Sequence, residues 1–245
     1  MRKTSDILGI PIDCVNMQEA LERIKLFLSE DKAHSVYTPN SEIMMEAQRD
    51  PYLKDILCSA DLLIADGAGV VMASRMLGCD LPERVTGVDL ANNILSLDIG
   101  RPIRLYLFGG KPGVAEKARD NILARYGNVE ICGCRNGYFS PEEVPGIISE
   151  INSTHSDVLL VALGRKKQES FIHENKNDLN AKVCIGCGGT IDIFAGTAEL
   201  APDFFRNHSL EWLFRLYKEP WRYKRMLDLP RFMFTVFKQK LRKKA

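Results

Sequence analysis

Short apolar runs alternate with stretches of helical periodicity along most of this 245-residue chain. The apolar runs predict strands at residues 35–38, 62–65, 104–108, 129–134, 157–162 and 182–185. Because each run is continuous rather than alternating, we expect strands buried on both faces. Apolar residues spaced three and four apart predict helices at residues 41–49, 70–77, 114–126, 141–152 and from about 168. This alternation indicates an α/β fold, a Rossmann-like and mostly parallel sheet with helices on both faces.

The N-terminal segment carries a weaker form of the same pattern. Residues 7–15 are expected to form one further strand, and residues 17–29 one further helix. The alternation stops near residue 196, where glycine and proline mark a junction. We therefore expect a catalytic domain of residues 1–196 and an appendage of residues 197–245.

The appendage should consist of short helices, because Pro220 and Pro230 interrupt its pattern. Its last segment can place four apolar side chains on one helical face, and basic residues flank that face. These side chains are Phe232, Met233, Val236 and Phe237. The pattern is typical of a helix that lies in the plane of a membrane interface, and a dimer contact through the same face is the competing interpretation.

Charge is distributed very unevenly between the two parts. Residues 204–245 contain 12 Lys or Arg and 3 Asp or Glu, a net charge of +9. The other 203 residues contain 21 basic and 29 acidic side chains, a net charge of −8. The appendage also holds ten of the twenty aromatic residues, including both tryptophans. Cations interleaved with aromatic rings favour an anionic membrane surface. A helical pair packed on the body, or a nucleic-acid-binding tail, would explain the composition differently.

No apolar run is long enough to span a bilayer, and no signal peptide is recognisable. The seven cysteines lie in apolar, strand-like contexts and are expected to be free thiols of a reducing cytosol. We expect a cytoplasmic protein, peripheral on the inner face of the cell membrane, with no metal, no cofactor and no nucleic-acid partner. The sequence leaves a homo-oligomer open.

Polar and glycine-rich residues follow each predicted strand, and ligands of parallel sheets bind at the carboxyl ends of the strands. Thr38 and Asn40 follow the first strand and either cap the next helix or face a ligand. Asp66 and Gly67 follow the second strand. A half-buried carboxylate there suits a general base, and a helix cap is the alternative. The glycines of this turn do not complete a dinucleotide fingerprint.

The later strand ends add candidates for phosphate and sugar binding. Gly110 and Lys111 lie in a glycine-rich turn before a helix, which suits a phosphate or simply a tight turn. Tyr138 can stack on a base or pack internally. Residues 165–167 place three cations after the fifth strand, either as an anion site or as solvated charge. Glycines before Asp192 indicate close backbone approach. Together these ends favour a nucleotide-sized ligand.

These motifs, in this order and over nearly the whole chain, resemble the WecG/TagA/CpsF family of bacterial glycosyltransferases, and its TagA branch most. The resemblance is carried by residues 38–40, 65–70, 73–75, 81–89, 108–113, 136–139, 167–169, 186–192, 210–216 and 218–225. The chain departs from the usual family pattern at Arg165 and Lys166.

The resemblance implies a metal-independent, inverting transfer of N-acetylmannosamine from a UDP-sugar to the 4-hydroxyl of undecaprenyl-diphosphate-linked N-acetylglucosamine, a step of wall teichoic acid synthesis. Asp66 would be the general base. The residues expected to bind substrate are Thr38, Asn40, Gly67, Arg84, Gly110, Lys111, Tyr138, Gln168, Asp192, Arg215, Arg222 and Arg225. The alternatives are a family transferase with another UDP-hexose or UDP-hexuronic acid donor, an NAD(P)-dependent oxidoreductase and a nonenzymatic membrane adaptor.

Overall fold

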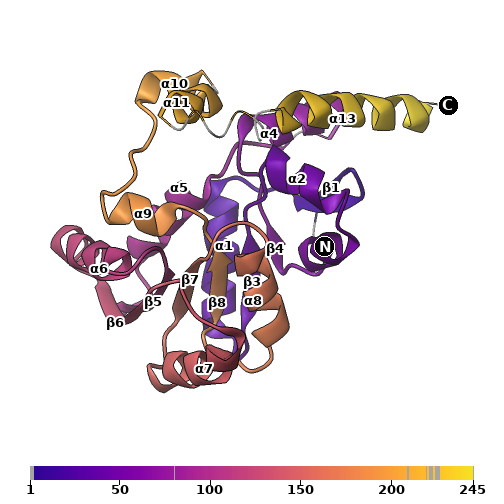
Figure 1. Cartoon of the computed structure of the whole chain (residues 1–245). Helices are drawn as coiled ribbons and strands as arrows, with labels where there is room; N and C mark the ends of the chain where they lie inside the picture. Colours follow the sequence, from indigo (N-terminus) through magenta and orange to yellow (C-terminus); the bar gives the residue numbers. More distant parts are fainter. Residues whose placement is uncertain are drawn as a thin grey trace.

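A computed structural model describes residues 3–79, 81–208, 210–218, 220, 223 and 227–244 of the chain. Its centre is a parallel sheet of six strands in the order β4-β3-β8-β7-β5-β6 (Figure 1). The strands are β3 (His34–Tyr37), β4 (Leu62–Leu63), β5 (Ile103–Gly109), β6 (Val129–Arg135), β7 (Val158–Ala162) and β8 (Val183–Gly186). The predicted α/β class and its Rossmann-like sheet are confirmed.

Helices cover both faces of the sheet and enclose two apolar cores, one on each side. One face carries α2 (Ser41–Ala47), α3 (Pro51–Cys58), α4 (Ala68–Met76), α7 (Val144–Ser153, preceded by the 3-10 turn η1, Pro141–Glu143) and α8 (Lys167–Asn175). The other face carries α1 (Met17–Ser29), α5 (Gly87–Leu95), α6 (Val114–Arg125) and α9 (Thr190–Phe194). Strands β3, β7 and β8 are buried at every residue and β5 at all but Arg104, as their apolar runs predict, whereas the edge strand β6 is mostly half-buried.

The prediction of a single strand over residues 7–15 is wrong. This part of the chain forms an antiparallel hairpin of β1 (Thr4–Ile7) and β2 (Ile10–Asp13), separate from the main sheet. Leu8 and Gly9 form its two-residue turn with φ angles of 57° and 77°. Two positive φ angles are typical of the tight turns that match the twist of a hairpin. The turn therefore reverses the chain where the apolar pattern suggested continuation.

The appendage lies on the side of the sheet where the strands end (Figure 1). Its described helices are α10 (Asp203–Asn207), α11 (Glu211–Lys218) and α13 (Asp228–Lys244). Pro230 does not break a helix, because it occupies the first turn of α13, where its missing N–H costs nothing. The boundary between residues 196 and 197 remains a prediction. In the part of the chain that the structure describes, no helix is long and apolar enough to cross a bilayer.

Helix α13 packs against the body, along α2 and α4. Phe232 and Val236 are fully buried in the same core as the hairpin. The Gln239 side chain accepts a hydrogen bond from the Leu8 amide at 3.0 Å and donates one to the Asp6 carbonyl at 3.2 Å. The expected interfacial face of Phe232, Met233, Val236 and Phe237 is thus wrong for Phe232 and Val236, which hold the helix to the body.

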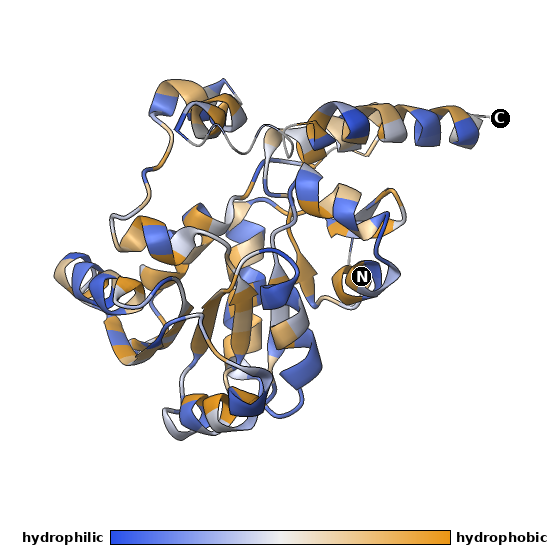
Figure 2. Cartoon of the chain, viewed as in Figure 1, coloured by the Kyte–Doolittle hydropathy of each residue, from blue (hydrophilic) through white to orange (hydrophobic). Residues whose placement is uncertain are grey.

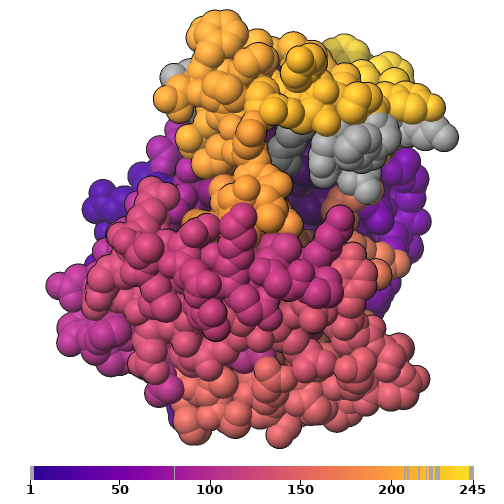
Figure 3. Space-filling view, turned by 60° about the vertical axis from the view of Figure 1, so that its left-hand side comes forward, coloured from indigo at the N-terminus to yellow at the C-terminus, as the bar shows by residue number. Residues whose placement is uncertain are grey.

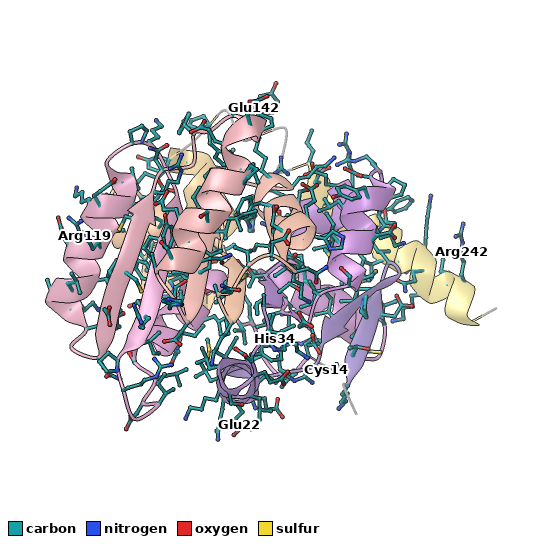
Figure 4. All side chains as sticks on the ribbon, turned by 90° about the horizontal axis from the view of Figure 1, so that it is seen from below. Cys14, Glu22, His34, Arg119, Glu142 and Arg242 are labelled. Carbon is teal, nitrogen blue, oxygen red and sulfur yellow. The ribbon has the colours of Figure 1, made fainter. Side chains whose placement is uncertain are left out.

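A second apolar stripe of α13 faces outward. Phe234, Phe237 and Leu241 are 60%, 46% and 53% exposed. At about 100° of rotation per residue, this stripe lies nearly opposite Phe232 and Val236. Arg242 projects from the far end of the helix, away from the body (Figure 4). Coloured by hydropathy, α13 mixes apolar and charged residues along its whole length (Figure 2).

Candidate active site

Asp66 lies where two neighbouring strands end. Because β3 and β4 are adjacent and parallel, the segments that follow them emerge at one edge of the sheet. The Asp66 amide donates to the Pro39 carbonyl at 3.1 Å. A Cβ placed on Gly67 would lie 3.6 Å from the Cβ of Asn40, and the φ of 106° at Gly67 favours glycine. Asp66 is half-buried, so it lies at the rim of the sheet rather than in the core.

Asn40 serves as a helix cap at this edge. Its Oδ1 accepts hydrogen bonds from the amides of Glu42 at 3.0 Å and Ile43 at 3.1 Å, at the start of α2. The cap occupies only the carbonyl oxygen of this side chain, and an amide side chain also carries an Nδ2 group with two donors. The capping interpretation is therefore confirmed, and the same side chain stands next to Gly67 with donor groups suited to a ligand.

Thr38 and Gln168 both contact the chain at the end of β8. The Thr38 hydroxyl lies 3.5 Å from the Gly186 carbonyl, to which it donates. Gln168 Oε1 accepts a hydrogen bond from the Gly188 amide at 3.0 Å. A Cβ on Gly186 would come within 3.2 Å of Gln168 Nε2. The glycines after β8 therefore allow the close approach that their sequence predicts, and they bring Gln168 beside Thr38.

The Glu169 carboxylate accepts a hydrogen bond from the Gln168 side-chain amide. Gln168 Nε2 donates to Glu169 Oε1 at 2.8 Å, and the two side chains are almost fully buried. Burial raises the pKa of the Glu169 carboxyl, although hydrogen bonds from Gln168 and from backbone amides oppose the shift. The pairing fixes which way the Gln168 amide points. Sequence analysis included Glu169 in a motif but assigned it no role.

The cations after β7 have acidic neighbours. Arg165 lies 3.3 Å from Glu42 and 3.5 Å from Glu46, and Lys166 lies 2.5 Å from Asp50. These ion pairs join the loop to the start of α3 and to α2. Two of the three side chains expected to form an anion site are therefore paired with carboxylates. Each new charge at the departure from the family pattern has an acidic partner from an earlier part of the chain.

Gly110 and Lys111 follow β5, farther along the sheet edge. The Gly137 amide donates to the Gly110 carbonyl at 2.9 Å, which joins the loops after β5 and β6. Gly110 has a φ of 73°, and a Cβ there would lie 2.9 Å from Val114. Lys111 is exposed, and Tyr138 is 66% exposed on the neighbouring loop. Since strands lie about 4.8 Å apart, three strand spacings separate β3 from β5 by about 14 Å, the length of a nucleotide sugar.

A cavity of about 350 Å³ opens between α4 and the loop before α5. Arg75, Arg84 and Arg206 all line it. Arg84 donates to Glu211 at 2.8 Å, and Arg206 donates to Asp89 at 2.9 Å. These pairs tie α10 and α11 to the body, and in the space-filling view the surface is hollowed beneath the appendage (Figure 3). Arg84 was expected at a substrate, Arg75 stood in a motif of the resemblance without a role, and Arg206 was not predicted.

Asp192 lies half-buried in α9, beyond the β8 glycines. Arg222 and Arg225 lie outside the described residues, and the side chain of Arg215 does as well. The structure thus brings Asp66, Asn40, Thr38 and Gln168 to one stretch of the sheet edge and places Gly110, Lys111 and Tyr138 at another. It leaves the three appendage arginines as predictions.

A larger hollow of about 750 Å³ lies at the opposite edge of the sheet, where the strands begin. His34, at the start of β3, marks that edge (Figure 4). None of the predicted site residues lines this hollow. Within the described ranges, no group of three or more His, Cys, Asp or Glu side chains could hold a metal ion.

The fold first places the chain in a class, that of α/β proteins with a parallel sheet, and its candidate site residues follow the carboxyl ends of the strands. The chain belongs to the glycosyl transferase WecG/TagA/CpsF family, whose model matches residues 5–245. It is therefore a hexosyltransferase, and the oxidoreductase and adaptor alternatives are wrong.

Relatives of this chain are N-acetylglucosaminyldiphosphoundecaprenol N-acetyl-β-D-mannosaminyltransferases. The protein of Bacillus subtilis strain 168 is 33% identical over 99% of this chain and 94% of its own length. The protein of Bacillus spizizenii is 33% identical over 86% and 82%. That of Staphylococcus aureus strain MRSA252 is 30% identical over 96% and 92%.

Proposed function

We propose that this protein transfers N-acetylmannosamine from UDP-N-acetylmannosamine to undecaprenyl-diphosphate-linked N-acetylglucosamine, the step that forms the linkage disaccharide of wall teichoic acid. The observation that carries the proposal is similarity over nearly whole chains to relatives named for this activity. The arrangement of the sheet edge supports it, because polar groups extend over a length suited to a nucleotide sugar.

Asp66 acts as the general base in this proposal. The acceptor's 4-hydroxyl oxygen attacks the anomeric carbon of the donor while its proton passes to the Asp66 carboxylate. The bond between that carbon and the phosphate oxygen breaks, and UDP leaves from the opposite face with the electron pair. The transfer therefore inverts the anomeric configuration. The half-buried position of Asp66 beside Asn40 and Gly67 supports this role.

The departing UDP develops negative charge, which cations and backbone amides must stabilise. The appendage residues Arg215, Arg222 and Arg225 supply guanidinium groups, which bind phosphate oxygens in pairs, whereas Arg84 lines the cavity beside α4 on the acceptor side. Gly110 and Lys111 provide an amide and an ammonium near the far end of the donor. Thr38, Asn40, Tyr138, Gln168 and Asp192 position the sugar and the uridine.

The appendage binds the anionic surface of the membrane in this proposal and so brings the site to its lipid acceptor. The protein then works as a peripheral protein on the cytoplasmic face. Exposed aromatic and apolar side chains on α11 and α13 support this role, among them Tyr217 at 81% exposure and Phe234 at 60%. Lys238 lies 4.6 Å from the Phe234 ring, an arrangement suited to a headgroup above an acyl chain.

Release of UDP from a panel of donors tests the proposal. UDP-N-acetylmannosamine, UDP-N-acetylglucosamine and a UDP-hexuronic acid are each incubated with the enzyme, with and without a short-chain lipid-diphosphate N-acetylglucosamine. We expect acceptor-dependent release from the first donor alone. Faster release from one of the other two would assign the protein to a related transferase with a different donor.

A further inference from the structure

One face of α4 forms a wall of the cavity beside the sheet edge. Ala68, Val71, Met72 and Arg75 are spaced by three, four and seven residues from the first, and all four line the cavity. That spacing places them on one side of a helix. The helix begins directly after Asp66 and Gly67. The wall therefore leads away from the proposed base along a straight path.

Arg75 differs from the other arginines of this cavity in its ion pairing. Arg84 and Arg206 line the cavity too, but both are held by carboxylates, Arg84 by Glu211 and Arg206 by Asp89 and Glu211. Among the residues that the structure describes, no carboxylate lies within ion-pair distance of Arg75. Its side chain is exposed to solvent. A guanidinium in this state favours an anion with paired oxygens, such as a phosphate.

The position of Arg75 matches the length of the acceptor. Seven residues separate it from Ala68, a rise of about 10 Å along the helix. If the acceptor's 4-hydroxyl lies at Asp66, its hexose ring and first phosphate together extend over a length comparable to this rise. The phosphate would then lie near Arg75. The donor's phosphates have a different place, along the strand ends between Gln168 and Gly110.

We propose that the cavity beside α4 binds the diphosphate of the lipid-linked acceptor, with Arg75 as its phosphate-binding residue. The inference rests on the proposed function, because it assigns a subsite to the acceptor of that reaction.

Calorimetric titrations of the full chain, with UDP at saturation to fill the donor site, test this assignment. The probes are farnesyl diphosphate and inorganic pyrophosphate, which share the diphosphate and differ in the prenyl chain. The variants are Arg75→Ala and Arg75→Lys. Arg119→Ala is the matched control, because Arg119 is an exposed arginine on α6 that pairs only locally with Asp120 at 2.9 Å. Thermal unfolding verifies that each variant is folded.

We expect Arg75→Ala to weaken both probes by about tenfold or more, the usual effect of removing a charged hydrogen-bond partner. Arg75→Lys should recover part of this loss, because lysine keeps the charge but not the paired geometry. Arg119→Ala should change neither.

Unchanged binding of both probes to Arg75→Ala would overturn the assignment, as would a wild-type protein that binds neither. A comparable loss of UDP affinity in Arg75→Ala, measured without the probes, would assign the cavity to the donor instead. These titrations involve no donor sugar, so a failure of the proposed transferase reaction, seen as absent turnover in wild type, is distinguishable from a failure of this subsite.

Discussion

At the scale of single residues, the proposed reaction depends most on Asp66. Replacing it with asparagine keeps the size of the side chain and removes the proton acceptor. We predict that Asp66→Asn lowers kcat by at least about 10²-fold, the usual lower size of a general-base contribution. Affinity for UDP should stay at the wild-type value. Steady-state kinetics and calorimetry check both statements.

Asp120→Asn is the matched control for this change, because Asp120 is an exposed carboxylate on α6. It should leave kcat unchanged. Turnover of Asp66→Asn within a few fold of wild type would remove Asp66 from the role of base, whatever the control does.

A second residue-scale prediction concerns stability and pH. Asp157 is buried and accepts hydrogen bonds from Arg101 at 2.6 and 2.7 Å. Burial alone would raise the pKa of Asp157, but the Arg101 hydrogen bonds and the Arg104 amide outweigh it and leave the pKa below its ordinary value. Because the folded-state pKa is depressed, the carboxylate stabilises the fold above the ordinary Asp pKa of about 3.9, and this is lost as the pH falls through the folded-state value.

Asp157→Asn should therefore lower the melting temperature clearly at pH 7 and progressively less as the pH falls through 4 toward 3. Thermal melts of wild type and variant across this range measure the difference. A gap that stays constant over the whole range would show that the carboxylate charge is not the cause.

At the scale of elements, α13 differs most from its prediction, because one of its apolar faces packs on the body. Phe232 is fully buried, whereas Phe234 on the same helix is 60% exposed. We predict that Phe232→Ala lowers the free energy of unfolding by about 3–5 kcal/mol, the usual loss for a buried phenylalanine. Phe234→Ala, the matched control, should change it by less than about 0.5 kcal/mol. Equal effects in urea unfolding would contradict the packing of α13 on the body.

The sheet was predictable from the sequence because most of its strands are largely apolar runs between turn residues. The helices α3 and α5 were missed, since a strict alternation of strand and helix leaves no place for two consecutive helices. The β1–β2 hairpin was missed because its turn, Leu8-Gly9, depends on backbone angles that an apolar pattern does not display.

The candidate site was predictable only in part. Residues after strand ends, such as Asp66 and Gln168, follow from the rule for parallel sheets. The partners of Arg165 and Lys166 lie on α2 and at the start of α3, more than 100 positions earlier in the chain. Such long-range pairs decide whether a cluster of cations binds an anion or joins two parts of the fold. The local sequence pattern does not reveal them. The motif that contains Arg75 was recognised, but its place in one cavity with Arg84 and Arg206 depends on segments far apart in the sequence.

At the scale of the whole molecule, the appendage is expected to connect fold and membrane. The outward stripe of α13 is available for this because the opposite stripe holds the helix to the body. Substituting Phe234, Phe237 and Leu241 together by serine should lower binding to vesicles with anionic lipid by at least about tenfold, since each side chain contributes about 1.5–3 kcal/mol when fully buried. The melting temperature should change little.

Co-sedimentation with vesicles of phosphatidylglycerol and phosphatidylcholine measures this binding, and pure phosphatidylcholine vesicles test the electrostatic part. Serine substitution of Leu26, an apolar side chain 62% exposed on α1, is the control for exposed surface elsewhere. Undiminished binding of the triple variant would place the membrane contact on another part of the chain.

The central claim is that the sheet edge joins an N-acetylmannosamine unit to a lipid-diphosphate N-acetylglucosamine. The most direct measurement is the structure of the product, isolated after incubation of the enzyme with UDP-N-acetylmannosamine and a short-chain acceptor, and determined by NMR. We predict a disaccharide in which N-acetylmannosamine is β-linked to the 4-hydroxyl of the acceptor sugar. An α linkage, another hydroxyl, or no disaccharide from this donor would contradict the account.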